Sequence, residues 1–139
     1  MPENNIRVGV PTLVVKGDRI LLGESNKGPA KGYFVIPGGG VDFGEKMADT
    51  SAREIFEETR LRIKNIKLFK AYELIVPEKG NHRIMILHTA EWESGEIVAG
   101  DDLSSADFFS RNQVAELIKS GKIASNSPAI QMLQDTGWL

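Results

Sequence analysis

Three glutamates near the middle of the chain have the spacing of a cation site. Glu54, Glu57 and Glu58 fall within five residues, and on a helix residues three and four apart are neighbours on one face. Like charges at this spacing destabilise a helix by roughly 0.2–0.5 kcal/mol per pair. A hard divalent cation such as Mg²⁺, which prefers oxygen ligands, would more than offset this repulsion. The alternative interpretation is a solvated acidic helix face.

A glycine run precedes these glutamates. Gly38, Gly39 and Gly40 have no Cβ atoms, so we expect their backbone to adopt unusual φ values and to approach a ligand closely. A glycine turn beside a helix offers carbonyl groups to a metal or amide groups to a phosphate. The two features together indicate a place where a metal and a phosphate meet.

The helix that must carry the glutamates is predicted over residues 46–59. Its apolar positions follow the spacing i, i+4, i+7, i+8 and i+11, namely Ala48, Ala52, Ile55, Phe56 and Thr59. The glutamates lie on the opposite side of the helical wheel. The helix therefore buries one face and presents three carboxylates on the other.

Strands are expected on both sides of this helix, and further helices follow them. Apolar and β-branched runs predict strands over residues 6–15, 19–24, 33–36, 63–76 (one long or two short strands), 83–92 and 106–110. Amphipathic patterns predict helices over residues 112–121 and from about Pro128 onwards. This order predicts an α+β fold, a mixed β-sheet with helices packed on it.

Composition narrows the class of protein. The 139 residues suit one domain over residues 1–139, and the net charge of −2 gives no overall positive field to attract nucleic acid or an anionic membrane. The absence of cysteine excludes disulfides, thiolate metal sites and a cysteine nucleophile. The first ten residues lack a signal pattern, and no apolar run reaches the ~20 residues of a membrane span, so we expect a cytoplasmic protein.

The full spacing around the glutamates resembles the Nudix box. The matching residues are Gly39, Glu45, Arg53, Glu54, Ile55, Glu57, Glu58 and Leu61. One position departs from the pattern, because Arg60 stands where the family has a glycine that closes the helix in a left-handed conformation. An arginine there either adopts that conformation at a cost of about 1 kcal/mol or ends the helix differently.

The resemblance implies an α/β/α sandwich and a metal-dependent hydrolase. Nudix enzymes use Mg²⁺ or Mn²⁺ to hydrolyse a nucleoside diphosphate linked to another group, with water attacking phosphorus. By this resemblance Glu54, Glu57 and Glu58 bind the metal together with the carbonyl of Gly38. Arg53, Glu45 and Gly39 are then structural, and the pair of Arg53 and Glu45 orients the metal-binding glutamates.

The group that accepts the proton from water is left open by the sequence. In some members of the family it is a glutamate of the box, here Glu54, and in others it is an acid on a later loop. Asp101 and Asp102 are the candidates on such a loop. His82 and His88 are further candidates, although the strand pattern around His88 favours a packed histidine.

The substrate is also left open, and no substrate-binding residue is predicted. The short chain and intact box resemble small nucleoside triphosphate pyrophosphohydrolases, which yield a monophosphate and pyrophosphate. The alternatives are a nucleotide-sugar hydrolase of the GDP-mannose or ADP-ribose kind, and a non-catalytic nucleotide-binding Nudix module. We expect a small nucleotide as the partner, no nucleic acid or membrane, and a homodimer as in many relatives.

Overall fold

The computed structural model describes residues 4–139 and confirms the predicted α+β fold class. The domain expected over residues 1–139 and the missing signal pattern in the first ten residues both include residues 1–3, which lie outside this range. Within residues 4–139, no helix is both long enough and apolar enough to cross a membrane.

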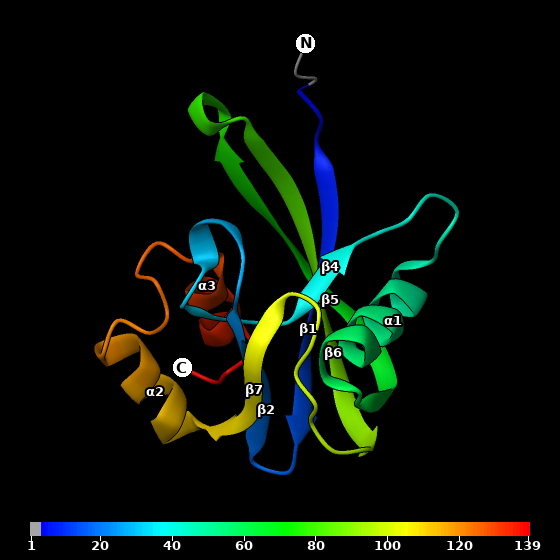
Figure 1. Ribbon diagram of the computed structural model, residues 1–139, viewed down its shortest axis with the longest axis vertical. Coiled ribbons are helices and arrows are strands. Elements are labelled where there is room, and N and C mark those ends of the chain that lie inside the picture. Colours follow the sequence, from blue (N-terminus) through cyan, green and yellow to red (C-terminus); the bar gives the residue numbers. More distant parts are fainter. Residues whose placement is uncertain (1–3) are drawn as a thin grey trace.

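A mixed sheet forms the centre of the fold (Figure 1). Its described strands are β1 (Arg7–Lys16), β2 (Arg19–Ser25), β3 (Phe34–Val35), β4 (Gly38–Gly40), β5 (Arg62–Val76), β6 (Asn81–Ser94) and β7 (Leu103–Ser110). The order is β3-β2-β1-β6-β5, with β4 paired to β1 and β7 paired to β2. β1 and β6 run parallel, whereas the other pairs are antiparallel.

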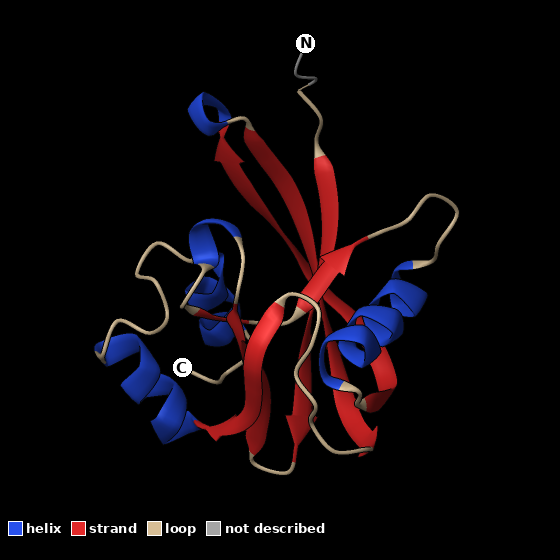
Figure 2. Cartoon of the chain, viewed as in Figure 1, coloured by secondary structure: helices blue, strands red, loops and turns tan. Residues whose placement is uncertain are grey.

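Helices lie on both sides of this sheet (Figure 2). The helices are α1 (Met47–Thr59), α2 (Arg111–Lys119) and α3 (Pro128–Asp135), with 3₁₀ turns at Gly28–Ala30 and Pro77–Lys79. On the α1 side, Ile55 and Leu61 pack with Val14 and Leu21. On the other side, a larger core joins the sheet to α2 and α3, including Leu13, Leu22, Leu87, Val114 and Leu133. Apolar burial on both faces of the sheet produces the sandwich.

The glycine run differs from the prediction in its local structure. Gly38, Gly39 and Gly40 form the short strand β4, and none of them has a positive φ. A Cβ at Gly38 would overlap the backbone of Val10 and Pro11, and a Cβ at Gly39 would overlap the Glu54 carboxylate. The expectation of an unusual φ is therefore wrong, because close packing against β1 and α1 is what requires glycine at positions 38 and 39.

The end of α1 settles the question raised by Arg60. Arg60 has φ 64° and ψ 10°, and its backbone N–H donates to the Phe56 carbonyl. The arginine thus takes the left-handed conformation that glycine takes in the family pattern. Its guanidinium lies over the Phe56 ring, 5.1 Å from the centroid.

The β5–β6 hairpin is longer than the rest of the sheet. β5 is one continuous strand with register shifts at residues 62–63, 64–67 and 68–70, which answers the choice between one strand and two. The turn end of the hairpin and the start of β1 project beyond the helices (Figure 1). A part of the sheet is therefore left without a covering helix.

Candidate active site

α1 holds the glutamates in a fixed position against the sheet. Ile55 is fully buried beneath the helix, and the hydroxyls of Ser51 and Thr12 share a buried hydrogen bond of 2.6 Å between α1 and β1. Gly39 lies directly against Glu54. The position of the carboxylates thus follows from the packing of α1 through Ile55 and Ser51 and from the absence of a side chain at Gly39, whereas Glu58 lies on the buried side of the helix.

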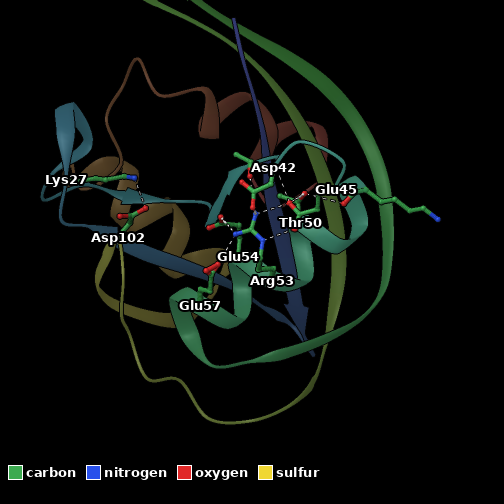
Figure 3. A network of polar contacts seen from close by, with 10 residues as sticks. Lys27, Asp42, Glu45, Thr50, Arg53, Glu54, Glu57 and Asp102 are labelled. Carbon is green, nitrogen blue, oxygen red and sulfur yellow. Dashed lines mark hydrogen bonds and ion pairs between the residues drawn. The ribbon is translucent and has the colours of Figure 1, made fainter. Parts of the chain in front are cut away.

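Arg53 and Glu45 form the ion pair that the box spacing predicts (Figure 3). Arg53 Nε donates to Glu45 Oε2 at 2.8 Å, and Nη2 donates to Oε1 at 2.9 Å. The Thr50 hydroxyl donates a further bond of 2.7 Å to Glu45. These hydrogen bonds, that from Arg53 above all, lower the pKa of Glu45 to about 2. The loop before α1 is therefore tied to the middle of the helix.

The same guanidinium holds two of the predicted metal ligands (Figure 3). Arg53 Nη1 donates to Glu54 Oε1 and to Glu57 Oε1, both at 2.8 Å. Its Nη2 also donates to the Gly40 carbonyl at 3.2 Å. Hydrogen bonds to Glu45 first, and then to Glu57 and Glu54, raise the pKa of Arg53 well above its usual value. Arg53 is thus the charged centre around which the box carboxylates are arranged.

Glu58 has very different surroundings. Its side chain is 2% exposed, and Oε1 has no hydrogen-bond partner among the described residues. Burial above all, together with the negative charges of Glu54, Asp102 and Asp101, raises the pKa of Glu58 to about 8, against a smaller opposing effect of a backbone hydrogen bond from Gly38. A buried carboxylate oxygen without a hydrogen-bond partner is costly, and no cationic side chain forms an ion pair with Glu58 among residues 4–139.

The loop after β6 brings the two later aspartates to the same place. The backbone N–H groups of Val98 and Gly100 donate to the carbonyls of Thr59 and Glu58, each at 3.0 Å, which docks the loop on the end of α1. Asp101 follows with a φ of 54°. The pKa of Glu54 is raised, chiefly by burial and additionally by Glu57 and Asp101. Glu54 and Asp101, which are 47 positions apart in the chain, therefore share one electrostatic environment.

Lys27 belongs to this cluster and was missed from the sequence. Its Nζ lies 2.6 Å from Asp102 Oδ2 (Figure 3). The neighbouring Asn26 donates from Nδ2 to the Asp101 carbonyl and from its backbone N–H to the Asp102 carbonyl, both at 3.0 Å. The sequence shows only two polar loops far apart in the chain, and nothing in either loop signals that they meet.

The two histidines lie elsewhere. His88 is buried within β6, and its Nδ1 lies 2.9 Å from the Ile86 carbonyl, as the packed-histidine interpretation predicted. His82 is the second residue of β6, at the turn end of the hairpin. Of the proton acceptors considered, the structure gathers Glu54, Asp101 and Asp102 in one place.

The donor set fits a hard divalent cation. The acidic groups that converge here are carboxylates, the ligand type that Mg²⁺ and Mn²⁺ prefer, and the partnerless Oε1 of Glu58 lies among them. Across residues 4–139, no three acidic or histidine side chains are already grouped as metal ligands. Arg53 holds Glu54 and Glu57 in this arrangement through the Oε1 atom of each, and its contacts do not involve their Oε2 atoms.

Comparison with known proteins agrees with this geometry. The family model described as "NUDIX domain" matches residues 4–129. The chain is 36% identical over 110 residues to the ADP-ribose pyrophosphatase of Methanocaldococcus jannaschii, covering 79% of this chain and 65% of that protein. It is 28% identical over 130 residues to the NAD-capped RNA hydrolase NudC of Edwardsiella ictaluri, covering 91% of this chain and 47% of that protein. The chain thus spans less than two thirds of each of these relatives.

A solved structure with the same fold adds a third comparison. It is a bifunctional NMN adenylyltransferase/ADP ribose pyrophosphatase from Francisella tularensis, complexed with AMP and a manganese ion. The TM-score is 0.77 at 22% identity, and the match covers 98% of this chain and 43% of that one. At this identity the similarity is evidence for the fold.

Proposed function

The chain belongs to the Nudix hydrolase family, and from this premise we propose that it hydrolyses the diphosphate of a nucleoside diphosphate joined to a sugar, with ADP-ribose as the reference substrate. The observation that carries the reaction is the cluster of box carboxylates around Glu58, whose Oε1 has no hydrogen-bond partner among residues 4–139. The choice of substrate is supported by the relative from Methanocaldococcus jannaschii.

This proposal changes the order of the substrates predicted from the sequence. The nucleoside triphosphate expected there is less well supported than the alternative nucleotide-sugar substrate, because the curated relatives are named for ADP-ribose and NAD-capped RNA. The expected exclusion of nucleic acid is not confirmed, since the second relative acts on a capped RNA. RNA is therefore included among the substrates to be tested.

A divalent cation would be held by Glu54, Glu57 and Glu58, with the Gly38 carbonyl as the fourth protein group. Members of the family depend on divalent metals, and such an ion neutralises the diphosphate and acidifies a bound water. Glu58 is buried, and its Oε1 has no hydrogen-bond partner among residues 4–139, so this oxygen is free to bind the ion.

The remaining residues of the site orient these carboxylates and handle the proton. Arg53 connects Glu45 to Glu54 and Glu57 and so determines where the two glutamates lie. We assign proton acceptance to Glu54 or to one of the aspartates on the loop after β6. Lys27 holds Asp102 in place by its ion pair. All of these groups lie on one helix and two docked loops, which favours a single geometry of attack.

The proposal is tested by incubating the protein with Mg²⁺ or Mn²⁺ and ADP-ribose, GDP-mannose, NADH, deoxynucleoside triphosphates or NAD-capped RNA in ¹⁸O-labelled water. We expect ADP-ribose to yield AMP and ribose 5-phosphate at the highest kcat/KM, with the label in one product only. The Glu57→Gln variant is the matched control for contaminating hydrolases. Pyrophosphate released from a triphosphate at a higher kcat/KM would overturn the substrate assignment.

A further inference from the structure

Two arginines lie side by side on the part of the sheet that no helix covers. Arg7 of β1 and Arg83 of β6 are partners in the parallel register. Neither forms an ion pair, side-chain hydrogen bond or cation–π contact with any residue of the described range 4–139. Like charges directly opposite each other destabilise a sheet, so this pair costs stability that the fold does not recover through its own contacts.

Another pair of basic residues in the same sheet shows how the fold usually satisfies such charges. Lys16 and Arg19 are also register partners, beside the β1–β2 turn. The Lys16 ammonium lies 4.1 Å from the centroid of the Trp92 ring, and Arg19 Nη1 donates to Gln113 Oε1 at 3.1 Å. Arg7 and Arg83 lack equivalents of these partners among the described residues, which points to an anion from outside the chain.

A strip without side chains lies next to the arginine pair. Gly9 of β1 is the register partner of Gly40 in β4. Neither glycine has a positive φ, and a Cβ on either would meet nothing closer than a backbone oxygen at 3.8 Å. The backbone therefore does not require glycine at these two positions. Glycine within a strand often marks the close approach of a ligand to the backbone. Such an approach would explain the glycines at positions 9 and 40.

Strand alternation places the arginines and the bare strip on one face. Arg7 and Gly9 are two residues apart in β1, so they share a face and lie about 7 Å apart, within reach of an arginine side chain. Tyr72 and Met85 are register partners, and Met85 is also the partner of Gly9. Because the Tyr72 hydroxyl donates to Asp135 of α3, this is the face on the α3 side.

The strip borders the candidate active site directly. Gly39 faces α1 and lies against Glu54, whereas the next residue, Gly40, belongs to the bare strip and accepts a hydrogen bond from Arg53. Arg7, Gly40 and Glu45 line one hollow of about 570 Å³, whereas Arg83 and Gly9 lie outside its lining. In the described sheet β4 pairs only with β1, so its outer edge is open to a ligand that extends from one face to the other.

We propose that Arg7 and Arg83 bind a phosphate of the nucleoside diphosphate substrate while the adjoining sugar lies on the bare Gly9–Gly40 strip. This assignment rests on the proposed function. One phosphate lies nearer the carboxylates of α1, and the other, joined to it by the bridging oxygen, lies within reach of the arginine side chains, which neutralise it. Paired arginines suit a phosphate because their planar guanidinium groups donate several bonds in a fixed geometry.

The test combines kinetics on ADP-ribose with calorimetric binding of AMP in Mg²⁺ buffer. We expect Arg7→Gln and Arg83→Gln each to raise KM and the Kd for AMP about tenfold, as for loss of a charged hydrogen bond, with kcat little changed. Arg7→Lys should recover part of the loss. Gly9→Ala and Gly40→Ala should raise KM without lowering the melting temperature, since their added methyl groups have room in the fold.

Two controls separate binding from folding. Arg62→Gln removes an arginine of β5 that lies over the Phe56 ring, and it should leave KM unchanged. Gly38→Ala should lower the melting temperature, because its Cβ overlaps the backbone of β1. An Arg7→Gln/Arg83→Gln double variant that folds and keeps the wild-type KM and Kd for AMP would overturn the proposal.

The experiment distinguishes failure of the proposed reaction from failure of the anion site. If the wild-type protein hydrolyses no diphosphate substrate but binds AMP in a way that depends on Arg7 and Arg83, the anion site stands and the proposed reaction fails. If ADP-ribose is hydrolysed equally well by the wild-type protein and the double variant, the reaction stands and the anion site fails. A wild-type protein that binds neither AMP nor pyrophosphate would also overturn the site.

Discussion

Glu45 and Glu58 are two glutamates of the same box whose surroundings shift their pKa values in opposite directions. Glu45 accepts two hydrogen bonds from Arg53 and one from Thr50, and its pKa falls to about 2. Glu58 is buried with one oxygen unpartnered, and its pKa rises to about 8. The charge of Glu45 is compensated by Arg53, whereas Glu58 has no compensating charge among the described residues.

This difference separates two roles for acidic residues on one structural unit. A carboxylate that is paired in the chain stabilises the fold and orients its neighbours. A carboxylate that is buried without a partner destabilises the fold, and such groups occur preferentially at functional sites. We therefore expect substitutions at the two glutamates to have opposite effects on stability, although both lower activity.

The largest effect is expected at Glu58. Glu58→Gln should lower kcat about a thousandfold, because a metal ion contributes several kcal/mol of charge stabilisation to the transition state. The melting temperature of the metal-free variant should equal or exceed that of the wild-type protein, since a neutral amide relieves the buried charge. Steady-state kinetics and thermal unfolding in a chelator measure the two effects. A sharp fall in melting temperature would show that Glu58 is structural.

Glu45→Gln should lower the melting temperature and reduce activity less than Glu58→Gln does. It removes the carboxylate that holds Arg53, so the metal-free melting temperature should fall. Activity should drop about tenfold or somewhat more, as for other groups that orient metal ligands. Arg53→Lys is a useful companion, because it keeps the charge but cannot reach Glu45, Glu54 and Glu57 together. Unchanged stability in Glu45→Gln would contradict the structural role of this pair.

The two glutamates also predict opposite pH dependences of stability in the metal-free protein. Between pH 4.5 and about 8 the unfolded chain releases the Glu58 proton while the folded chain keeps it, so the free energy of unfolding falls as pH rises. For Glu45 the stabilising contribution is present above pH 4.5 and is lost as pH falls towards 2. The advantage of Glu58→Gln in melting temperature should therefore grow by several degrees between about pH 5 and pH 8. A constant difference across this range would show that the Glu58 carboxyl ionises normally.

The smallest effect is expected where the chain departs from the family pattern. Arg60→Gly should raise the free energy of unfolding by about 0.5–1 kcal/mol, because the left-handed conformation is costly for arginine and free for glycine. The contact of Arg60 with the Phe56 ring offsets part of this gain. Urea unfolding measures the difference, with Arg62→Gly as the control in an extended conformation. A loss of stability in Arg60→Gly would show that the contact with Phe56 outweighs the backbone cost.

The features predicted correctly from the sequence are those that depend on local pattern. The helical period placed Ile55 and Thr59 inside, and the rigid box spacing brought Glu45 to Arg53. The same period was wrong for Ala48 and Ala52, which are exposed, and for Glu58, which was expected on the outer face and is buried. Alternation and turn residues gave the strands and the α+β class.

The features that were missed depend on which distant segments lie side by side. Gly38, Gly39 and Gly40 were expected in a turn, because their pairing with β1 is a tertiary contact. Lys27 meets Asp102 across two loops, and Arg7 meets Arg83 through a parallel register 76 residues apart. No local pattern encodes such a register, so these residues become visible only in the folded chain.

The central claim is that the partnerless carboxylate of Glu58 is completed by a divalent cation, and a metal titration followed by thermal unfolding tests it most directly. Adding Mg²⁺ or Mn²⁺ to the metal-free wild-type protein should raise the melting temperature with saturation, because an ion that binds only the folded state stabilises it. The increase should be much smaller in Glu58→Gln and should persist in Arg62→Gln. An equal increase in wild type and Glu58→Gln would contradict the claim.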